Sequence, residues 1–190
     1  EIGACDWSSD VCSSDLTMGG FFIYVVIYTM GMKRYSIHSA LVFSLSGAAP
    51  PVAGYCAVSV QFDTASRLLL VIFCIWQMPH WFAIAIFRKD DYEAAAIPVL
   101  PSLRGMDVTR FQIIVYIAAF MASVSMLTFT GYTGYLTLAV MCALGGWWMV
   151  TALRRAKARD ERAWAKKVFG LSILNIMALS VLMAVDFGAV

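Results

Sequence analysis

Residues Leu68–Tyr92 read LLLVIFCIWQMPHWFAIAIFRKDDY, and this stretch decides the fold class. Its first twenty residues, Leu68–Phe87, contain no Lys, Arg, Asp or Glu, and four charged residues follow directly. About 20 mostly apolar residues in a helix span the hydrocarbon core of a bilayer. A strand would need period-2 alternation of apolar residues, which is absent. The stretch therefore predicts a transmembrane helix that ends in a charged interface.

The composition of the whole chain agrees with a membrane protein. Of 190 residues, 61% are hydrophobic and 14% are charged, whereas soluble domains have about 45–50% apolar and about 25% charged residues. This balance excludes a disordered chain and an ordinary soluble enzyme. The net charge of only +2 argues against a nucleic-acid partner. The five cysteines lack C-x-x-C or metal-ligand spacing, so they predict neither a disulfide framework nor a zinc site.

Six apolar segments predict an all-α fold, a polytopic membrane helix bundle with about six transmembrane helices. The segments are Met18–Met32, Ser39–Phe62, Leu68–Phe87, Phe111–Thr130, Tyr135–Leu153 and Val168–Val185. If all six span the bilayer, thirteen of the fourteen basic residues lie on one side and only Arg67 lies on the other. The positive-inside rule makes the basic side cytoplasmic. The C-terminus is then expected on the outer, periplasmic side.

The first sixteen residues, EIGACDWSSDVCSSDL, differ from the rest of the chain. They hold four of the twelve acidic residues and none of the fourteen basic ones, so the remainder carries +6. A secretory signal needs a basic start and an apolar core, and neither is present. The string is similar to a translated sequencing adapter. We expect residues 1–16 to be a disordered, non-native leader and 17–190 to be a partial domain, although a polar natural N-terminus would also fit.

His80 is the most unusual residue inside an apolar segment. It follows Pro79, which removes a backbone donor, and it lies about 12 Å from Arg88 along a helix axis. If the helix continues, His80 and Asp91 share one face, because eleven residues are close to three turns. Ionisable groups within a membrane segment point to function, but a hydrogen bond to a neighbouring helix would explain His80 equally well.

A charged run, Arg88–Tyr92, follows this segment. Two carboxylates beside two cations suit a diphosphate bridged by Mg²⁺, because carboxylates bind the metal and cations bind the phosphate oxygens. An ordinary interfacial belt of paired charges is the alternative. Lys33 and Arg34 could likewise bind an anion or only set the topology. Pro50 and Pro51 predict a kinked helix that lines a pocket or only packs, and Arg154–Lys167 predicts a surface anchor that includes Trp164.

Four motifs together carry a family resemblance. The strings are YTMGMKR (Tyr28–Arg34), SLSGAAPPVAGY (Ser44–Tyr55), WQMPHWFAIAIFRKDDY (Trp76–Tyr92) and the following AAAIPVLP. They resemble the protoheme IX farnesyltransferases, or heme O synthases, of the intramembrane prenyltransferase superfamily, from about Thr17 to Phe187. The resemblance implies nine membrane helices around a central cavity. It also implies farnesyl transfer from farnesyl diphosphate to a vinyl group of heme B, with Mg²⁺ at the diphosphate.

The resemblance also assigns residue roles. It implies a catalytic set of His80, Arg88 and Asp91, with His80 facing heme or the developing cation. The implied diphosphate and substrate contacts are Lys33, Arg34, Arg88, Lys89, Tyr92 and Arg104, and the implied metal ligands are Asp90 and Asp91. The implied setting is a bacterial inner membrane, with heme A synthase or terminal oxidase assembly as further partners.

One departure limits the resemblance. The family's first Asn/Asp-rich metal motif should lie before Thr17, where the leader stands, so we expect this chain alone to lack activity. A prenyltransferase acting on a quinone precursor remains an alternative, although its second motif should be richer in Asp. A non-enzymatic transporter or assembly scaffold is another, although transporters often contain internal repeats and none is evident here.

Overall fold

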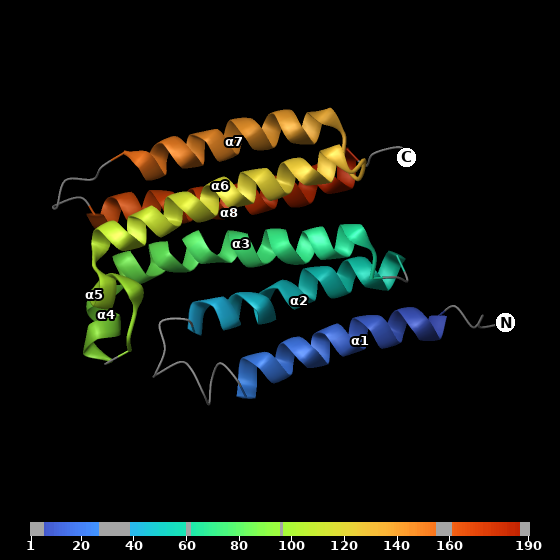
Figure 1. The fold of residues 1–190 in the computed structure, drawn as a ribbon, viewed down its shortest axis with the longest axis horizontal. Helices are drawn as coiled ribbons and strands as arrows, with labels where there is room; N and C mark the ends of the chain where they lie inside the picture. Colours follow the sequence, from blue (N-terminus) through green and yellow to red (C-terminus); the bar gives the residue numbers. More distant parts are fainter. Residues whose placement is uncertain (1–5, 27–38, 60–61, 96, 155–160, 187–190) are drawn as a thin grey trace. The chain divides into compact units, whose positions relative to one another are not determined.

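The protein is helical throughout the residues that the structure, a computed structural model, describes; these exclude 1–5, 27–38, 60–61, 96, 155–160 and 187–190. Within them no β-strand occurs, which confirms the all-α prediction. Figure 1 shows eight described helices: α1 (Asp6–Phe22), α2 (Ser39–Ser59), α3 (Thr64–Phe87), α4 (Lys89–Ala94), α5 (Leu100–Arg104), α6 (Met106–Phe129), α7 (Tyr135–Leu153) and α8 (Glu161–Val185).

The chain divides into two compact units, Glu1–Cys74 and Ile75–Val190, with the boundary inside α3. In the first unit, α1 packs closely against α2. A Cβ on Gly20 would lie 2.7 Å from Cβ of Ala49, so a larger residue would push the two helices apart. Pro50 and Pro51 follow this contact and lie inside α2, which remains helical across both.

Asp63 joins the end of α2 to the start of α3 within the first unit. Its Oδ1 accepts a hydrogen bond from the Ser66 backbone N–H at 2.9 Å, and its Oδ2 accepts one from the Tyr55 hydroxyl at 3.0 Å. A carboxylate before the first turn satisfies a backbone donor that has no partner within the helix. Asp63 is therefore the N-cap of α3.

In the second unit, α6, α7 and α8 pack through large buried side chains and one small residue. Trp148 of α7 is fully buried, contacts Phe120 of α6 edge to face, and donates its indole N–H to the Val168 carbonyl of α8 at 3.0 Å. A Cβ on Gly145 would lie 2.9 Å from Cγ of Met121, so α6 and α7 approach each other closely there.

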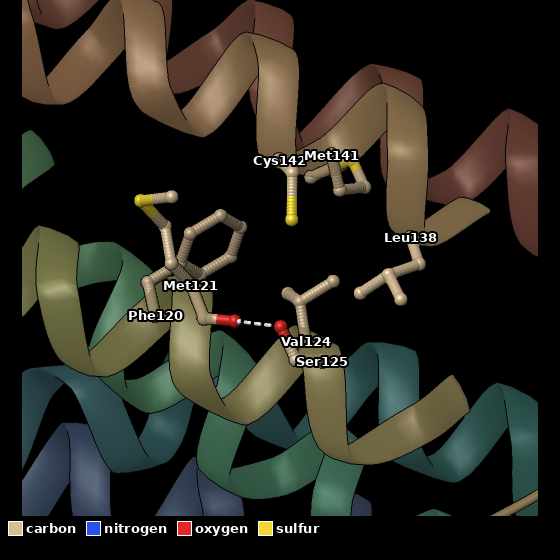
Figure 2. Close-up of a pocket in the computed structure, with 7 residues that line it drawn as sticks. All are labelled: Phe120, Met121, Val124, Ser125, Leu138, Met141 and Cys142. Carbon is tan, nitrogen blue, oxygen red and sulfur yellow. Dashed lines mark hydrogen bonds between the residues drawn. The ribbon is translucent and has the colours of Figure 1, made fainter. Parts of the chain in front are cut away.

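The close approach of α6 and α7 opens into a small gap. Figure 2 shows that the Cys142 thiol points into this gap from α7, opposite Ser125 of α6. The Ser125 hydroxyl donates to the Met121 carbonyl within its own helix at 2.9 Å. The other lining side chains are apolar: Phe120, Met121, Val124, Leu138 and Met141.

Four described helices are long and apolar enough to cross a membrane, namely α3, α6, α7 and α8. They confirm four of the six predicted segments. The predicted segment Ser39–Phe62 corresponds to α2. The predicted segment Met18–Met32 runs into residues outside the described part, and a shorter apolar helix covers Ser14–Val26.

Two regions differ from the sequence predictions. The predicted disordered leader is helical from Asp6 onward, because α1 begins there. Trp164 was predicted as a surface anchor, but it is only 6% exposed and donates its indole N–H to the Thr151 carbonyl of α7 at 2.9 Å. This packing extends α8 through the charged sequence that precedes its apolar part.

The two ends of the second unit differ in charge. At one end, here named the charged end, α3 and α7 finish, α4 and α5 lie, and α6 and α8 begin (Figure 1). The opposite end, where α6 and α8 finish and α7 begins, is here named the capped end. Every described basic residue of this unit lies at or near the charged end: Arg88, Lys89, Arg104, Arg110, Arg154, Arg162, Lys166 and Lys167.

Candidate functional site

The candidate site is built on a break in the chain after α3. The Arg88 backbone N–H still bonds to the Ile84 carbonyl at 2.9 Å, but Arg88 has φ −106° and ψ 19°, and α4 starts at the next residue. The Asp91 N–H then bonds to the Arg88 carbonyl at 3.0 Å. A shared face for His80 and Asp91 was expected only if the helix continued, and the break after Phe87 means that this condition is not met.

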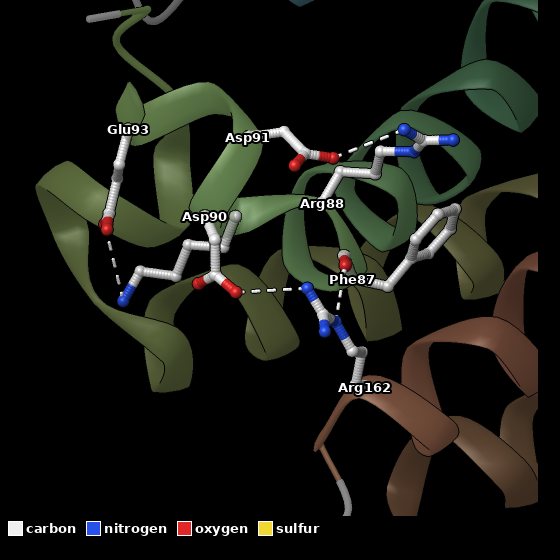
Figure 3. Close-up of polar contacts among 7 residues, drawn as sticks. Phe87, Arg88, Asp90, Asp91, Glu93 and Arg162 are labelled. Carbon is white, nitrogen blue, oxygen red and sulfur yellow. Dashed lines mark hydrogen bonds and ion pairs between the residues drawn. The ribbon is translucent and has the colours of Figure 1, made fainter. Parts of the chain in front are cut away.

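Arginines flank both aspartates beside this break (Figure 3). Nη1 of Arg88 lies 3.2 Å from Oδ2 of Asp91. Nη2 of Arg162, from the start of α8, lies 3.0 Å from Oδ2 of Asp90. The same guanidinium donates from Nε to the Phe87 carbonyl at 2.9 Å. That carbonyl belongs to the last turn of α3, where acceptors lack partners within the helix.

Glu93 connects the two short helices. It accepts a hydrogen bond from the Ser102 hydroxyl of α5 at 2.9 Å and lies 3.6 Å from the Lys89 ammonium. Tyr92 is half-buried, and its carbonyl accepts the Ile97 N–H at 3.0 Å. Arg104 is exposed at the end of α5.

The predicted residues of the charged run are thus gathered at one place. Arg88, Lys89, Asp90 and Asp91 lie together around the break. Within the described residues Arg104 has no ion pair with them. Lys33 and Arg34, predicted to bind diphosphate, lie outside the described residues.

The ion pairs of this cluster are exposed. The side chains of Arg88 and Asp91 are 62% and 64% exposed, and those of Arg162 and Asp90 are 60% and 79% exposed. Pairs of this kind contribute about 0–1 kcal/mol to stability. These pairs therefore contribute little to the stability of the fold.

The oxygen donors of the cluster fit a hard cation only in part. Among the described residues there is no group of three or more His, Cys, Asp or Glu side chains that could hold a metal ion. Asp90 and Asp91 each use Oδ2 for an arginine, and in the described part Oδ1 of each has no hydrogen bond. Mg²⁺ is commonly bound by one or two carboxylates together with phosphate oxygens and water. One oxygen of each aspartate is therefore available to Mg²⁺ that arrives with a phosphate ligand.

His80 lies apart from the charged cluster, on the face of α3 that meets α8. Its Nδ1 lies 2.8 Å from the Ser172 hydroxyl, and that hydroxyl lies 2.6 Å from the Phe169 carbonyl. Because the carbonyl can only accept, the hydroxyl proton points to Phe169, and His80 donates from Nδ1. The hydrogen bond between helices predicted as one alternative for His80 is confirmed.

Aromatic rings surround this imidazole. Its ring centroid lies 5.1 Å from that of Trp76 and 4.6 Å from that of Phe169. The Trp76 indole N–H donates to the Ser172 carbonyl at 2.8 Å, so Ser172 receives both residues of α3. Moving a charged imidazolium out of water into an apolar bundle of membrane helices would be costly. The contacts therefore favour a neutral ring that carries its proton on Nδ1 and keeps its lone pair on Nε2.

Two site residues were missed by the sequence analysis. Arg162 belongs to the basic run that was interpreted as a surface anchor, and nothing in its spacing distinguishes it from its neighbours. Ser172 lies inside an apolar helix, where a hydroxyl that also bonds its own backbone gives no signal of a partner. Each has a partner more than seventy positions away in the sequence: Asp90 for Arg162 and His80 for Ser172.

Sequence comparison gives this arrangement its family. The UbiA prenyltransferase family matches residues 5–176, a range that begins inside the predicted leader. The chain belongs to the UbiA prenyltransferase family and is an integral membrane protein. No solved structure matches the chain.

Three similar relatives are all named protoheme IX farnesyltransferase. A protoheme IX farnesyltransferase of Yersinia pseudotuberculosis is 55% identical over 172 residues, which are 90% of this chain and 58% of that protein. The protoheme IX farnesyltransferase of Chromohalobacter salexigens is 56% identical over 168 residues, or 88% of this chain and 57% of that protein. The protoheme IX farnesyltransferase of Salmonella arizonae is 54% identical over 168 residues, which are also 88% of this chain and 57% of that protein. The chain thus spans less than 60% of the length of these relatives.

Proposed function

We propose that the enzyme to which this sequence belongs transfers the farnesyl group of farnesyl diphosphate to a vinyl group of heme B, with addition of water, to give heme O. The observation that carries the proposal is the 55% identity to protoheme IX farnesyltransferases across 90% of the chain. The exposed cluster of Arg88, Lys89, Asp90 and Asp91 supports it, because its charges suit a diphosphate and a cation.

The proposed chemistry requires a leaving diphosphate to be stabilised. In this proposal Asp90 and Asp91 hold Mg²⁺ through the oxygens that make no ion pair, and Arg88 and Lys89 bind the diphosphate oxygens, with Lys33, Arg34, Tyr92 and Arg104 as further contacts. Bound Mg²⁺ would neutralise the charge that develops on the leaving group. Fixed cations act in the same direction, and a site enclosed by membrane helices keeps a farnesyl cation from bulk water.

His80 is proposed to face heme or the developing cation. A neutral ring does not repel a positive charge, and the Ser172 hydroxyl fixes the orientation of the imidazole through Nδ1. Nε2 then offers a lone pair to the apolar part of the site. The aromatic rings of Trp76 and Phe169 lie beside this imidazole.

The proposed location is a bacterial inner membrane with the charged end in the cytoplasm and the C-terminus in the periplasm. The gathering of eight described basic residues of the second unit at one end supports this orientation. Heme A synthase or terminal oxidase assembly remains a proposed partner, since such an enzyme would consume heme O.

A chimera tests the proposed activity. Residues 17–186 replace the matching segment of the Yersinia pseudotuberculosis relative, and membranes containing the chimera receive heme B and farnesyl diphosphate. We expect mass spectrometry to detect heme O. The chain expressed alone is the parallel arm and is expected to be inactive. A well-expressed chimera that makes no heme O, or that prenylates an aromatic quinone precursor instead, would contradict the proposal.

A further inference from the structure

The two aspartates of the candidate site are held in the same way by two different arginines. Arg88 contacts Oδ2 of Asp91 and lies three residues before it in the chain. Arg162 contacts Oδ2 of Asp90 and lies 72 residues after it in the chain, at the start of α8. In Figure 3 the two carboxylates turn toward different sides of α4, each toward its own arginine.

Arg162 differs from Arg88 because it has a second anchor. Its Nε donates to the Phe87 carbonyl at 2.9 Å while Nη2 contacts Asp90 at 3.0 Å. One planar guanidinium thus bridges the last turn of α3 and the first turn of α4, on either side of the break. The fixed fork of donors in arginine allows both contacts at once, and a lysine ammonium cannot reproduce that geometry.

The rest of α4 provides little to hold Asp90 in place. None of the six residues of α4 is buried, and its first turn has no side-chain cap. Lys89 and Glu93 pair along its own surface, and Glu93 is tied to Ser102 of α5. The described contact between the first turn of α4 and α8 is therefore the one made by Arg162.

We propose that Arg162 is a positioning residue for the metal-binding carboxylate of Asp90. It fixes Oδ2 and leaves Oδ1 for the cation, and it couples the start of α8 to the site. Partners that orient a ligating carboxylate in this way commonly change metal affinity about 10- to 100-fold when they are removed. This inference rests on the proposed function, because it takes Asp90 as a ligand of Mg²⁺ bound with a diphosphate.

The first test needs no ligand. Hydrogen–deuterium exchange of the purified full chain in nanodiscs compares wild type, Arg162→Gln and Lys166→Gln. The matched control removes one positive charge from the same helix at an exposed residue that has no ion pair in the described part of the chain. We expect faster exchange in residues 89–94 for Arg162→Gln, none for Lys166→Gln, and no further increase when Asp90→Asn is added to Arg162→Gln. Unchanged exchange in Arg162→Gln would overturn the inference.

The second test separates positioning from a merely structural role. In the chimera described above, the apparent Kd of Mg²⁺ is measured with inorganic pyrophosphate present, and that of pyrophosphate is measured without Mg²⁺. We expect Arg162→Gln to raise the Kd of Mg²⁺ about 10-fold, Arg162→Lys to recover part of the loss, and Lys166→Gln to leave it unchanged. An altered exchange with an unaltered Kd of Mg²⁺ rejects the positioning role.

The same two measurements distinguish failure of the proposed function. A chimera with the wild-type segment that binds no Mg²⁺ with pyrophosphate contradicts the proposed site itself, and the positioning role is rejected with it. In that case the exchange result still reports whether Arg162 holds the first turn of α4. An effect on Mg²⁺ that is equal in Arg162→Gln and Lys166→Gln would show general charge attraction and would also overturn the inference.

Discussion

At the charged end of the second unit, Asp90 and Asp91 each use one oxygen for one exposed arginine, whereas at the capped end Asp186 is bound from several sides. Oδ2 of Asp186 accepts from both the backbone N–H and the hydroxyl of Thr137, at 2.8 and 2.7 Å. The Asp186 carbonyl also accepts the Gly134 N–H at 3.1 Å. These contacts join the end of α8 to the first turn of α7.

The difference shows which carboxylates are committed to the fold. Gly134 precedes α7 without a side-chain cap, and Thr137 is the third residue of that helix. Asp186 therefore supplies, from another helix, the acceptor that an N-cap side chain normally provides. At the charged end, the exposed pairs leave one oxygen of each aspartate unused. The first arrangement suits stability, and the second suits a ligand.

Asp91→Asn in the chimera tests whether the aspartates at the charged end serve a ligand and not the fold. We expect heme O formation to fall about 100-fold, because an amide binds Mg²⁺ more weakly and lacks the negative charge. The thermal midpoint of the purified protein should change little, since the lost pair with Arg88 is exposed. A large fall in the midpoint, or full activity, would place Asp91 with the structural carboxylates instead.

Asp186→Ala tests the opposite end. We expect the free energy of unfolding to fall by about 2 kcal/mol, because the first turn of α7 loses the acceptor of two hydrogen bonds. Asp186→Asn retains an acceptor oxygen and should lose less. Unfolding in mixed detergent measures both, and the Kd of Mg²⁺ with pyrophosphate should be unaffected in the folded protein. An Asp186→Ala variant as stable as wild type would contradict the role of Asp186 in joining the end of α8 to the first turn of α7.

Gly145→Ala and Gly146→Ala form a matched pair between the two ends. A Cβ at Gly145 would lie 2.9 Å from Met121, whereas nothing lies within 4 Å of a Cβ at Gly146. We expect the first substitution to cost about 1–2 kcal/mol through overpacking of α6 against α7. The second should be neutral or slightly stabilising, because alanine favours the helix. Equal effects of the two substitutions would show that this contact does not set the helix spacing.

The apolar part of the fold could be predicted from the sequence because hydrophobic length is a local property. The predicted segment Tyr135–Leu153 coincides with α7, and the predicted Leu68–Phe87 ends where α3 ends. The start of α8 could not be predicted in this way. Its first turns, from Glu161, are charged, and their packing depends on Trp164 reaching Thr151 of another helix.

The charged residues of the site could be predicted from the sequence, but their spatial arrangement could not. The run Arg88–Asp91 was found, yet its residues favour helix continuation, and no Gly or Pro marks the break after Phe87. The role of Arg162 depends on a contact between residues seventy-two positions apart.

Asp63 offers the smallest and most specific test, because it caps α3 as Asp186 caps α7. Burial raises its pKa, but the hydrogen bonds from the Ser66 backbone, the Tyr55 hydroxyl and neighbouring groups outweigh this, so the pKa of Asp63 is lowered. A carboxyl with a lowered pKa in the folded state adds stability above its unfolded pKa of about 4. That contribution is lost as the pH falls through the folded pKa.

The wild-type chain should therefore lose stability as the pH falls below about 4, and Asp63→Asn should lose less over the same range, because asparagine does not titrate. At pH 7 Asp63→Asn should keep most of the cap, whereas Asp63→Ala should cost about 1 kcal/mol. Tyr55→Phe is the matched control, since it removes one hydrogen bond to the carboxylate but keeps the bond to Ser66. Thermal midpoints measured from pH 7 to pH 3 separate these cases. Parallel pH profiles for wild type and Asp63→Asn would mean that Asp63 stabilises α3 through its hydrogen bonds and not through its negative charge.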